Sequence, residues 1–422
     1  MTGKELAVLL YGRQVATVRQ TEGGQHTLEY VADPGRTPVS VSMPLSRRRH
    51  SHRSVEPFLE GLLPDNDDTR AAMGREFGVS GRNPFSLLGR MGLDCAGAVQ
   101  FCDPAQSDEV LARSGELRLV DDVEIGQRIA DLADVSGVSW VLPSERWSLA
   151  GAQSKFALHW TGSGWAQALG ATPTTHIIKP GIRSLASQAL NEHVCMRTAA
   201  RCGLPVADST YTEFDGHAAI VVKRYDRLVG SDGSVLRVHQ EDLCQAMAVP
   251  PSRKYEADGG PSAAKVLHLL RSERVAHGES EFMSALIFNY LIGGSDAHAK
   301  NFSILLVAGD AQFAPMYDVA SAFPYDLPQR FGAARSRRPE MSFSIGGARR
   351  FGGVGPENWA KLARLADIDP DAALGSVRDL AGRLPDALRD AFAEVASVAG
   401  AAELENRMLP EVDRACRAAL DG

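Results

Sequence analysis

The C-terminal half of the chain contains the octapeptide Gly294-Ser295-Asp296-Ala297-His298-Ala299-Lys300-Asn301, which places Asp296 five positions before Asn301. The apolar run Phe282–Ile292 precedes it and predicts a helix, because it is long and almost free of charge. A second run, Phe302–Val307, follows at once and predicts a strand. We therefore expect the octapeptide to form a loop between a buried helix and a strand.

The residues that follow predict a β-hairpin. Ala308-Gly309-Asp310-Ala311 is typical of a turn, and a second strand-like run then delivers Met316-Tyr317-Asp318-Val319. Such a hairpin brings Asp318 back beside Asn301. Asp, Asn and Asp in this order are the components of a kinase catalytic loop, in which one carboxylate orients the attacking hydroxyl and the other two side chains hold Mg²⁺. The alternative is that Asp296 and Asn301 only cap loops by bonding nearby backbone.

Length and composition describe an ordinary globular protein. The 422 residues are enough for two or three domains, with 44% hydrophobic and 23% charged residues. A net charge of −7 argues against a surface built for nucleic acid, and no apolar run approaches the ~20 residues of a membrane helix. The N-terminus lacks a signal-peptide pattern, so a cytoplasmic protein is expected. The six cysteines form no Cys-x-x-Cys pair, so we expect reduced, packed thiols.

The order of patterns along the chain predicts three regions. Residues 1–105 begin with short strands and continue with helices over 55–90 and a strand-like run at 96–101. Residues 103–118 are polar and predict a boundary. From about residue 119 to about residue 345 the pattern mixes strands and helices, and residues 356–421 have helical spacing. The run Arg47–Arg53 is locally basic; it suits either phosphate binding or a solvated loop.

A candidate phosphate loop lies at Trp147–Lys155. Its small residues allow backbone N–H groups to approach phosphate oxygens, and the strand-like run Phe156–Trp160 follows. The loop does not fit the P-loop pattern, which precedes a helix. Taken by itself, the segment is better explained as an ordinary connector.

Two further segments suit a nucleotide site. Lys179 ends the apolar strand Thr175–Pro180, as the phosphate-binding lysine of kinases does, and Glu192 on the next predicted helix is a candidate partner for it. Ala219–Arg227 predicts a buried strand with a polar end, which suits a hinge that reads the adenine edge. The alternatives are an exposed strand-end lysine and a plain edge strand. The order of loop, lysine, glutamate, hinge and catalytic segment is the order that a two-lobed kinase needs.

With these strings the chain resembles the HipA family of bacterial toxin serine/threonine kinases. The resemblance covers nearly the whole chain. Its strings are Phe58–Asp65, Ser148–Lys155, Thr175–Lys179, Val222–Arg227, His239–Gln245, Lys254–Pro261, Ser295–Phe302 and Tyr317-Asp318. It implies an α+β, two-lobed protein-kinase-like fold with an N-terminal β-rich subdomain and an all-helical C-terminal region. In the domain order it implies, residues 1–105 form the N-terminal subdomain, 119–225 the kinase N-lobe and 226–422 the C-lobe.

The resemblance also implies roles for individual residues, with ATP and Mg²⁺ as cofactors. Asp296 matches the catalytic aspartate, and Asn301 and Asp318 match the metal ligands. The implied nucleotide-binding residues are Ala150, Gly151, Ala152, Gln153, Ser154, Lys155, Lys179, Lys223, Arg224, Tyr225, His298, Lys300, Asn301 and Asp318. Ser148 matches a serine that such kinases autophosphorylate, which shuts off ATP binding.

Family members act with a small HipB-like helix-turn-helix antitoxin, and the complex represses its own operon. The resemblance therefore implies contact with operator DNA through the antitoxin, no membrane association, and a protein substrate such as an aminoacyl-tRNA synthetase. The chain departs from eukaryotic kinases in lacking Asp-Phe-Gly at Asp318 and the Gly-x-Gly-x-x-Gly loop. It departs from relatives at Ser154, where an acidic residue is common. A small-molecule phosphotransferase and a non-enzymatic co-repressor remain the alternatives.

Overall fold

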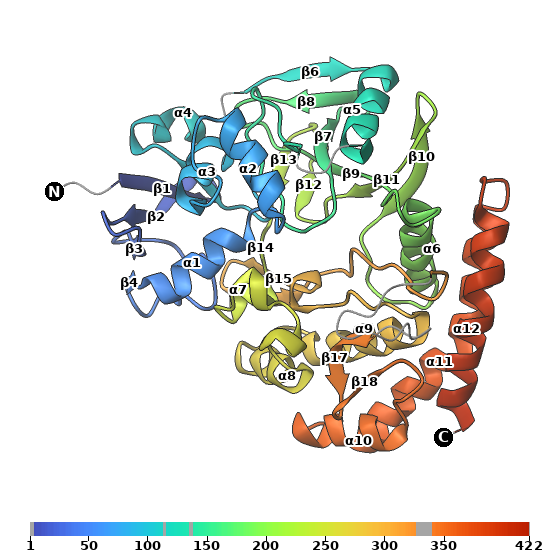
Figure 1. Ribbon diagram of the computed structural model, residues 1–422. Coiled ribbons are helices and arrows are strands. Elements are labelled where there is room, and N and C mark those ends of the chain that lie inside the picture. The colour runs from blue at the N-terminus through green and yellow to red at the C-terminus, as the bar shows by residue number, and fades with distance from the viewer. Residues whose placement is uncertain (1–3, 113–114, 135–137, 326–339, 422) are drawn as a thin grey trace. The chain divides into compact units, whose positions relative to one another are not determined.

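The computed structural model describes residues 4–112, 115–134, 138–325 and 340–421. The chain forms two compact units (Figure 1). The first unit comprises residues 1–180, 212–252 and 303–311, and the second comprises 181–211, 253–302 and 312–422.

The first unit begins with a five-stranded antiparallel sheet of order β4-β3-β2-β1-β5. Its strands are β1 (Lys4–Leu10), β2 (Arg13–Gln20), β3 (His26–Tyr30), β4 (Arg49–His50) and β5 (Gln100–Cys102). Three helices follow in the chain, namely α1 (His52–Gly61), α2 (Asp67–Glu76) and α3 (Pro84–Met91). Asn66 and Asn83 cap α2 and α3 by accepting backbone N–H bonds, which explains where these helices start.

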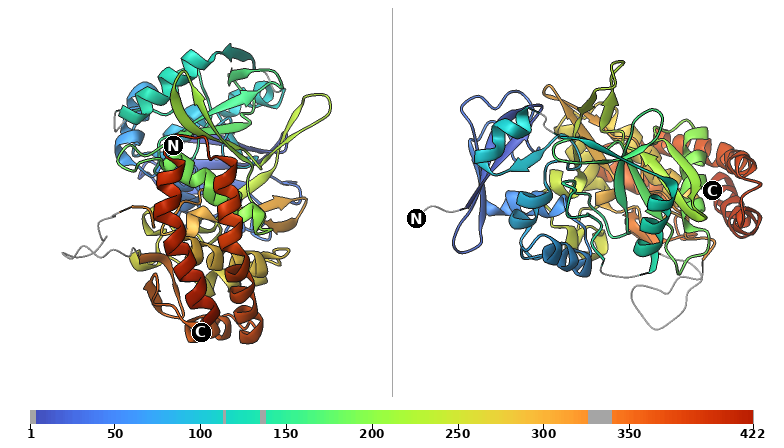
Figure 2. Two further views of the ribbon diagram at one scale, coloured as in Figure 1. Left: turned by 90° about the vertical axis from the view of Figure 1, so that its right-hand side faces the viewer. Right: turned by 90° about the horizontal axis from the view of Figure 1, so that it is seen from above.

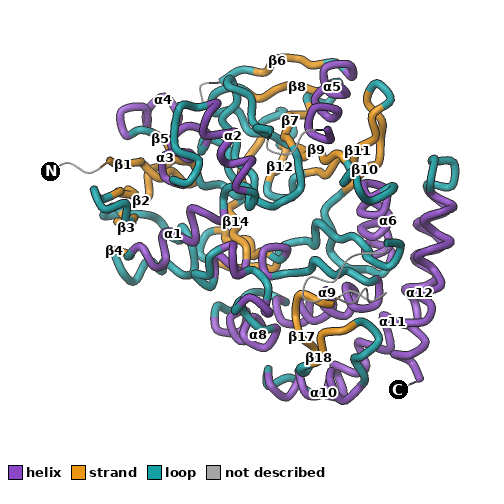
Figure 3. Tube along the Cα trace, in the orientation of Figure 1, coloured by secondary structure: helices purple, strands orange, loops and turns teal. Residues whose placement is uncertain are grey.

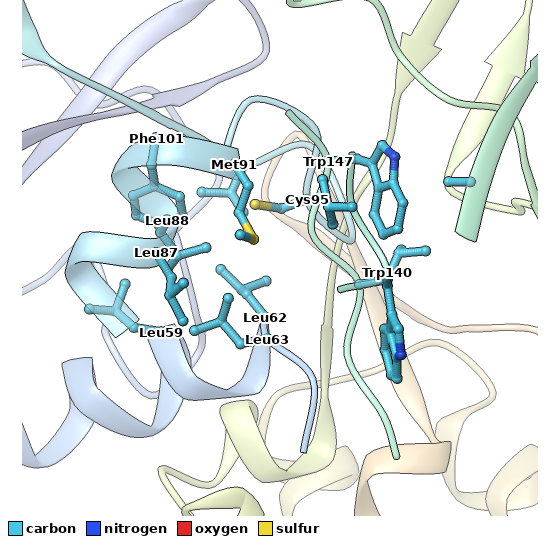
Figure 4. Close-up of a cluster of buried hydrophobic side chains, with 14 of the residues drawn as sticks. Leu59, Leu62, Leu63, Leu87, Leu88, Met91, Cys95, Phe101, Trp140 and Trp147 are labelled. Carbon is cyan, nitrogen blue, oxygen red and sulfur yellow. The ribbon is translucent and has the colours of Figure 1, made fainter. Parts of the chain in front are cut away.

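An apolar cluster joins these helices to the segment that carries the candidate phosphate loop. Figure 4 shows leucines from α1, from the turn after it and from α3 together with Met91 and Cys95. Trp140 and Trp147, from the loop segments that precede β7, lie in the same cluster. Trp140 and Trp147 are each 1% exposed. Burial of such large aromatic side chains fixes the backbone that leads into the candidate phosphate loop.

A second sheet of the first unit has the order β10-β11-β9-β7-β8-β6. Its strands are β6 (Leu117–Val120), β7 (Phe156–Trp160), β8 (Trp165–Ala168), β9 (His176–Pro180), β10 (Ser209–Phe214) and β11 (His217–Lys223). The central pairs β11–β9, β9–β7 and β7–β8 are antiparallel, and α5 (Asp122–Asp134) packs against β9 and β11. The chain between the two sheets contains the short η1 (Pro104–Gln106) and α4 (Ser107–Leu111).

The remaining strands form small pairings. A hairpin of β12 (Arg227–Val229) and β13 (Val235–Arg237) follows the predicted hinge. The sheet β14-β15-β16 contains β14 (His239–Asp242), β15 (Ser303–Val307) and β16 (Asp310–Phe313). Ala308 and Gly309 have φ of 54° and 94°, as the tight turn between β15 and β16 requires. Helix α7 (Leu243–Ala246) starts from a capping box made by Asp242 and Gln245.

The second unit is mainly helical, as the colouring of Figure 3 shows. Its helices are α6 (Gln188–Arg201), α8 (Ala263–Ser272), α9 (Gly278–Ile292), α10 (Pro356–Leu365), α11 (Pro370–Glu394) and α12 (Ala401–Asp421), with the short η3 (Glu256–Asp258) and η4 (Ala299–Asn301). Helix α9 is buried along most of its length, and α11 packs against both α6 and α9. The long helices α11 and α12 lie side by side (Figure 2). A two-stranded sheet, β17 (Glu340–Ile345) and β18 (Ala348–Arg350), packs against α10.

Most expected elements are confirmed, and the mixed α+β class is correct. The helix over 282–292, the strand 156–160, the hairpin at 303–313 and the C-terminal helices are present. One expectation is wrong: Asp318 does not lie on a strand, because β16 ends at Phe313 and the φ of Asp318 is 58°. The strand expected at 96–101 is shorter and later, at Gln100–Cys102.

The expectation of reduced, packed thiols is also met. All six cysteines are free and buried. Within the described ranges, no helix combines the length and the apolar character needed to cross a membrane.

Candidate functional site

The Asp296 loop begins where helix α9 is forced to end. Gly293 follows the helix with φ of 83°, a left-handed conformation that favours glycine. A Cβ at Gly293 would also lie 2.7 Å from the Phe323 ring, so the position has no room for a side chain. The buried helix therefore delivers the chain to the Asp296 loop at a defined point.

Asp296 presents its carboxylate to the solvent. The side chain is 69% exposed, and the Tyr255 hydroxyl donates a hydrogen bond to its Oδ1. The backbone carbonyl of Asp296 accepts bonds from the His298 N–H at 2.8 Å and from the Asn301 side chain at 2.7 Å. The loop thus folds around the Asp296 backbone and leaves the carboxylate at the surface, where a substrate hydroxyl can approach it.

Asn301 and Asp318 meet in one small pocket. The residues that line it are Asn289, Ala297, Asn301, Phe302, Met316, Tyr317, Asp318 and Val319. Because Nδ2 of Asn301 donates to the Asp296 carbonyl, the amide oxygen is the atom that Asn301 offers to a cation. An amide oxygen and a carboxylate are the hard oxygen ligands that Mg²⁺ prefers. The donor set therefore fits Mg²⁺.

The hairpin positions Asp318 in the way expected, although through a bend rather than a strand. After β16, Met316 pairs with the chain at 205–207: its N–H donates to Pro205, and its carbonyl accepts from Ala207. Tyr317 donates its hydroxyl to the Lys300 carbonyl at 2.8 Å. Asp318 follows with a positive φ, a strained conformation that often marks functional sites.

Two residues of the site had no role in the sequence-based prediction. Tyr255 holds Asp296, and its ring lies edge-on to His298 at 4.8 Å. Asn289 lines the pocket from helix α9. The string Lys254–Pro261 signalled the family without indicating that its tyrosine contacts the Asp296 carboxylate, because nothing in the spacing of 255 and 296 is periodic.

Strand β17 supports the same loop from another direction. Ser342 donates its hydroxyl to the Ser295 carbonyl at 2.7 Å, and Ser344 donates its hydroxyl to Glu256 at 2.9 Å. The Asp296 loop and the string Lys254–Pro261 are therefore both tied to β17.

The candidate phosphate loop lies in the first unit and is held on several sides. The Asp65 N–H donates to the Gly151 carbonyl at 2.9 Å, and Gln153 donates to the Pro180 carbonyl at 3.0 Å. The Lys155 ammonium, 5.5 Å from the Trp140 ring centre, donates to the Ala150 carbonyl at 2.9 Å. The Asp65 contact gives the string Phe58–Asp65 a structural role, since the segment that follows α1 supports this loop. Ala152 and Ser154 lie on the same loop, exposed and half-buried respectively.

Ser148 is inaccessible in this conformation. It is 0% exposed, and its hydroxyl donates to the Leu62 carbonyl at 2.7 Å. Its N–H donates to the Asp94 carbonyl at 3.0 Å. A phosphate cannot be added to Ser148 unless this part of the loop moves out of its buried position.

Lys179 lies on the central strand β9, opposite Ile220 of β11, and is 5% exposed. A lysine this buried needs compensating polar contacts. The expected partner, Glu192, is 0% exposed on α6 of the second unit. The pairing of Lys179 with Glu192 stays a prediction.

The predicted hinge follows β11. Lys223 is exposed, whereas the Arg224 side chain is 2% exposed and bonded to buried carboxylates. The Tyr225 hydroxyl donates to Gln240, and burial raises its pKa far above the usual range. The side chain of Arg224 is therefore committed to the protein, and nucleotide binding by Lys223–Tyr225 stays a prediction.

The basic run at 47–53 is partly neutralised. Arg48 and Arg49 each place Nε 3.3 Å from Oε1 of Glu29, which also pairs with Arg19. Such contacts favour the solvated-surface interpretation of this run over phosphate binding.

Family models of known proteins match both halves of the chain. A family model described as "HipA-like C-terminal domain" matches residues 147–388, and one described as "HipA N-terminal domain" matches residues 6–102. The second range lies wholly in the first unit, together with the candidate phosphate loop and hinge.

Individual relatives agree with the family models. A putative kinase of Sinorhizobium fredii is 34% identical over 413 residues, which cover 94% of this chain and 92% of that protein. The serine/threonine-protein kinase toxin HipA of Shewanella oneidensis is 31% identical over 317 residues, 70% of each chain. Among solved structures, a HipA from Shewanella oneidensis, in a complex with HipB and operator DNA, covers 99% of both chains with a TM-score of 0.82 at 24% identity.

Proposed function

The chain belongs to the HipA family, and from that membership we propose that it is an ATP- and Mg²⁺-dependent protein serine/threonine kinase that acts as the toxin of a toxin–antitoxin pair. The observation that carries the proposal is the meeting of Asn301 and Asp318 in one pocket, beside the exposed carboxylate of Asp296. These are the two functions, metal binding and hydroxyl orientation, that phosphoryl transfer requires of a protein.

Each residue of the catalytic segment has a distinct task. Asp296 orients the substrate hydroxyl and accepts its proton, and Tyr255 holds that carboxylate through the hydroxyl bond. Asn301 and Asp318 would hold Mg²⁺, which neutralises charge on the nucleotide phosphates. His298 and Lys300 lie on the same loop, each nearly buried, and are assigned to the phosphates.

The nucleotide is assigned to the first unit's loop, strand and hinge. The backbone of Ala150–Lys155 would approach the phosphates, with Lys179 as their cationic partner. The chain at Lys223–Tyr225 would meet the adenine. Support comes from the way neighbouring chain holds the loop, through Asp65 and Gln153, so that its backbone is ordered before nucleotide binds.

Ser148 is proposed as an off switch through autophosphorylation. A phosphate adds about two negative charges at pH 7, and the seat of Ser148 is fully buried. A phosphorylated Ser148 cannot return to the Leu62 carbonyl, since both groups are hydrogen-bond acceptors. The loop would then stay out of its seat, and the kinase would lose its phosphate-binding backbone.

The partner is proposed to be a HipB-like helix-turn-helix antitoxin, through which the complex meets operator DNA and represses its operon. Support comes from the Shewanella oneidensis structure, which holds HipA, HipB and operator DNA together. The proposed substrate is a protein of translation, such as an aminoacyl-tRNA synthetase, whose phosphorylation would arrest growth.

The test uses the whole chain with γ-labelled ATP and a bacterial lysate. Wild type should label a protein band, and Asp296→Asn should label none, with a loss of at least ~100-fold as expected for a lost catalytic base. The matched control is Asp386→Asn, because Asp386 is also a surface carboxylate (86% exposed) but lies on α11. Labelling by Asp296→Asn at the wild-type level would refute the proposed mechanism.

The same variants separate the two alternatives. A small-molecule phosphotransferase would transfer label to a low-mass fraction and to no protein. A non-enzymatic co-repressor would arrest growth equally well as wild type or as Asp296→Asn. The kinase proposal expects Asp296→Asn to lose toxicity while it still binds the antitoxin.

A further inference from the structure

The first unit contains a cluster of charged side chains buried from solvent. Its members are Asp94, Arg224, Asp226, Arg227 and Arg237, and we call it the buried charge cluster. The first four are each at most 3% exposed, and the Arg237 side chain is 10% exposed. Two carboxylates thus face three guanidinium groups inside the protein.

Asp94 is the centre of this cluster. Its Oδ1 accepts from Arg227 at 2.9 Å and from Arg237 at 2.8 Å. Its Oδ2 accepts from Arg224 at 3.3 Å and from the N–H and hydroxyl of Thr174 at 2.9 and 2.7 Å. Both oxygens are therefore saturated with donors.

Asp226 completes the cluster next to the hinge. It accepts two bonds from Arg224, at 3.0 and 2.9 Å, and one from the Gly97 N–H at 2.7 Å. Burial by itself would raise the pKa of Asp94, but attraction to the three guanidinium groups lowers it well below its usual range. Removal of one partner from such a cluster leaves a buried charge uncompensated, which is costly.

The contacts of Asp94 reach three parts of the proposed nucleotide site. Arg224 is in the hinge, and Thr174 directly precedes the segment that leads into β9 and Lys179. The Asp94 backbone carbonyl accepts from the Ser148 N–H at 3.0 Å. One residue therefore contacts the hinge, the lysine strand and the phosphate loop.

Asp94 itself is anchored from the other side. Its neighbour Cys95 points into the apolar cluster beside Met91, and Trp147, the neighbour of Ser148, lies in the same cluster (Figure 4). The Cys95 carbonyl accepts from Arg224 at 2.8 Å and from Arg227 at 2.9 Å. The segment at 94–95 therefore contacts the apolar cluster through the Cys95 side chain and the buried charge cluster through the Asp94 side chain and the Cys95 carbonyl.

Resting on the proposed kinase function, we propose that Asp94, which belongs to the N-terminal domain, is the positioning residue of the nucleotide site. It holds the hinge, the start of the lysine strand and the base of the phosphate loop at fixed distances, and it touches neither nucleotide nor substrate. The affinity for ATP is therefore set in part by the N-terminal domain, through this one carboxylate.

The test is Asp94→Asn, which keeps the shape and removes the charge. In one orientation the introduced amide N–H₂ group would face the donors of Arg227 and Arg237, and in the other it would face those of Arg224 and Thr174. Either arrangement sets donor against donor, so the hinge and the strand must shift. We expect KM and Kd for ATP to rise on the order of 10- to 100-fold, with kcat changed less than about threefold, because the catalytic segment lies elsewhere in the chain.

A second pair of variants keeps the inference testable if Asp94→Asn does not fold. Thr174→Val removes the hydroxyl that bridges Asp94 and Arg224 while retaining the side-chain shape. It should raise KM for ATP several-fold, and Thr174→Ser, which restores the hydroxyl, should return KM to the wild-type value.

A control distinguishes positioning from general loss of stability. Val18→Ala removes buried apolar volume from β2, in the same domain but outside the cluster. It should lower the urea midpoint without changing KM for ATP. A KM that rises equally in Val18→Ala, or that is unchanged in folded Asp94→Asn and Thr174→Val, would overturn the inference. Absence of ATP binding by wild type would instead refute the kinase function, and this inference with it.

Discussion

Because Ser148 is buried, we predict that the Ser148→Asp variant releases the loop and binds ATP more weakly. The serine side chain is 0% exposed, and its hydroxyl donates to the Leu62 carbonyl. An ionised carboxylate at this buried position would face the Leu62 carbonyl, which is also an acceptor, and would lose its hydration. The desolvation penalty of a buried ion is several kcal/mol in real proteins. The cost is avoided if the loop moves out into solvent.

The cost of releasing the loop can be estimated from its contacts. The hydrogen bonds that tie it to surrounding chain include four: Ser148 N–H to Asp94, Ser148 hydroxyl to Leu62, Asp65 N–H to Gly151, and Gln153 to Pro180. At ~1 kcal/mol each they contribute ~4 kcal/mol, and burial of Leu149 adds ~2 kcal/mol. The two opposing costs are of similar size, so Ser148→Asp should populate the released state substantially.

The matched variant Ser148→Ala separates the charge from the lost hydroxyl. It removes one donor and leaves the Leu62 carbonyl unsatisfied, which should lower the free energy of unfolding by ~1–2 kcal/mol. The loop has no reason to leave its seat, so ATP affinity should stay within about threefold of wild type. Ser148→Asp should lower ATP affinity at least ~10-fold, because the released loop cannot offer its backbone to the phosphates.

The assay is titration with ATP by calorimetry, together with limited trypsin digestion. Release of the loop should expose the bonds after Arg146 and Lys155 to trypsin in Ser148→Asp and not in Ser148→Ala. The control is Ser163→Asp, on an exposed turn of the same unit, which should behave as wild type. Wild-type ATP affinity and wild-type trypsin resistance in Ser148→Asp would refute the reasoning.

Three further predictions concern the second unit, the pH dependence and the core. Tyr255→Phe removes the hydroxyl that holds Asp296, so kcat should fall ~10-fold while KM for ATP is unchanged; steady-state kinetics would contradict this if kcat stayed at the wild-type value. Burial lowers the pKa of His239 to about 4, below the ~6.5 of an unfolded chain. The unfolded state therefore binds the extra proton, and the free energy of unfolding should fall as pH drops from ~6.5 to ~4, by up to ~1.4 kcal/mol per pH unit. Urea titrations at pH 7 and 5 should show this slope, and His239→Gln should reduce it. Phe282→Ala deletes a fully buried ring among other aromatic side chains and should cost ~3–5 kcal/mol in urea denaturation; a loss under 1 kcal/mol would contradict the packing.

The geometry of the segment from α9 to Asp318 was predictable because it is local. A buried helix, a loop and a tight hairpin are separate short patterns, and a hairpin returns the chain to its start whatever the rest of the protein does. Asn301 and Asp318 could therefore be placed together before any long-range contact was known. The error about Asp318 is also local: its positive φ has no signature in an Asp residue, which adopts several backbone conformations.

The hinge was predictable only as a strand with a polar end. The sequence shows Arg224 in a plausible place for a nucleotide, whereas the fold commits its guanidinium to Asp94 and Asp226. The separation of residues 94 and 224 exceeds the reach of any periodic pattern. Their pairing follows from packing of the N-terminal domain against the β9–β11 sheet.

By itself, the sequence determined the class of fold, the chain order of the candidate site and the hairpin that joins Asn301 to Asp318, since those depend on contacts between residues close along the chain. Tertiary structure alone decided that Ser148 is buried against Leu62, that Tyr255 bonds to Asp296 and that Asp94 contacts Arg224, Thr174 and Ser148. Such contacts join residues 41 to 130 positions apart, and they form only when apolar faces from distant segments pack and leave their polar groups to find one another.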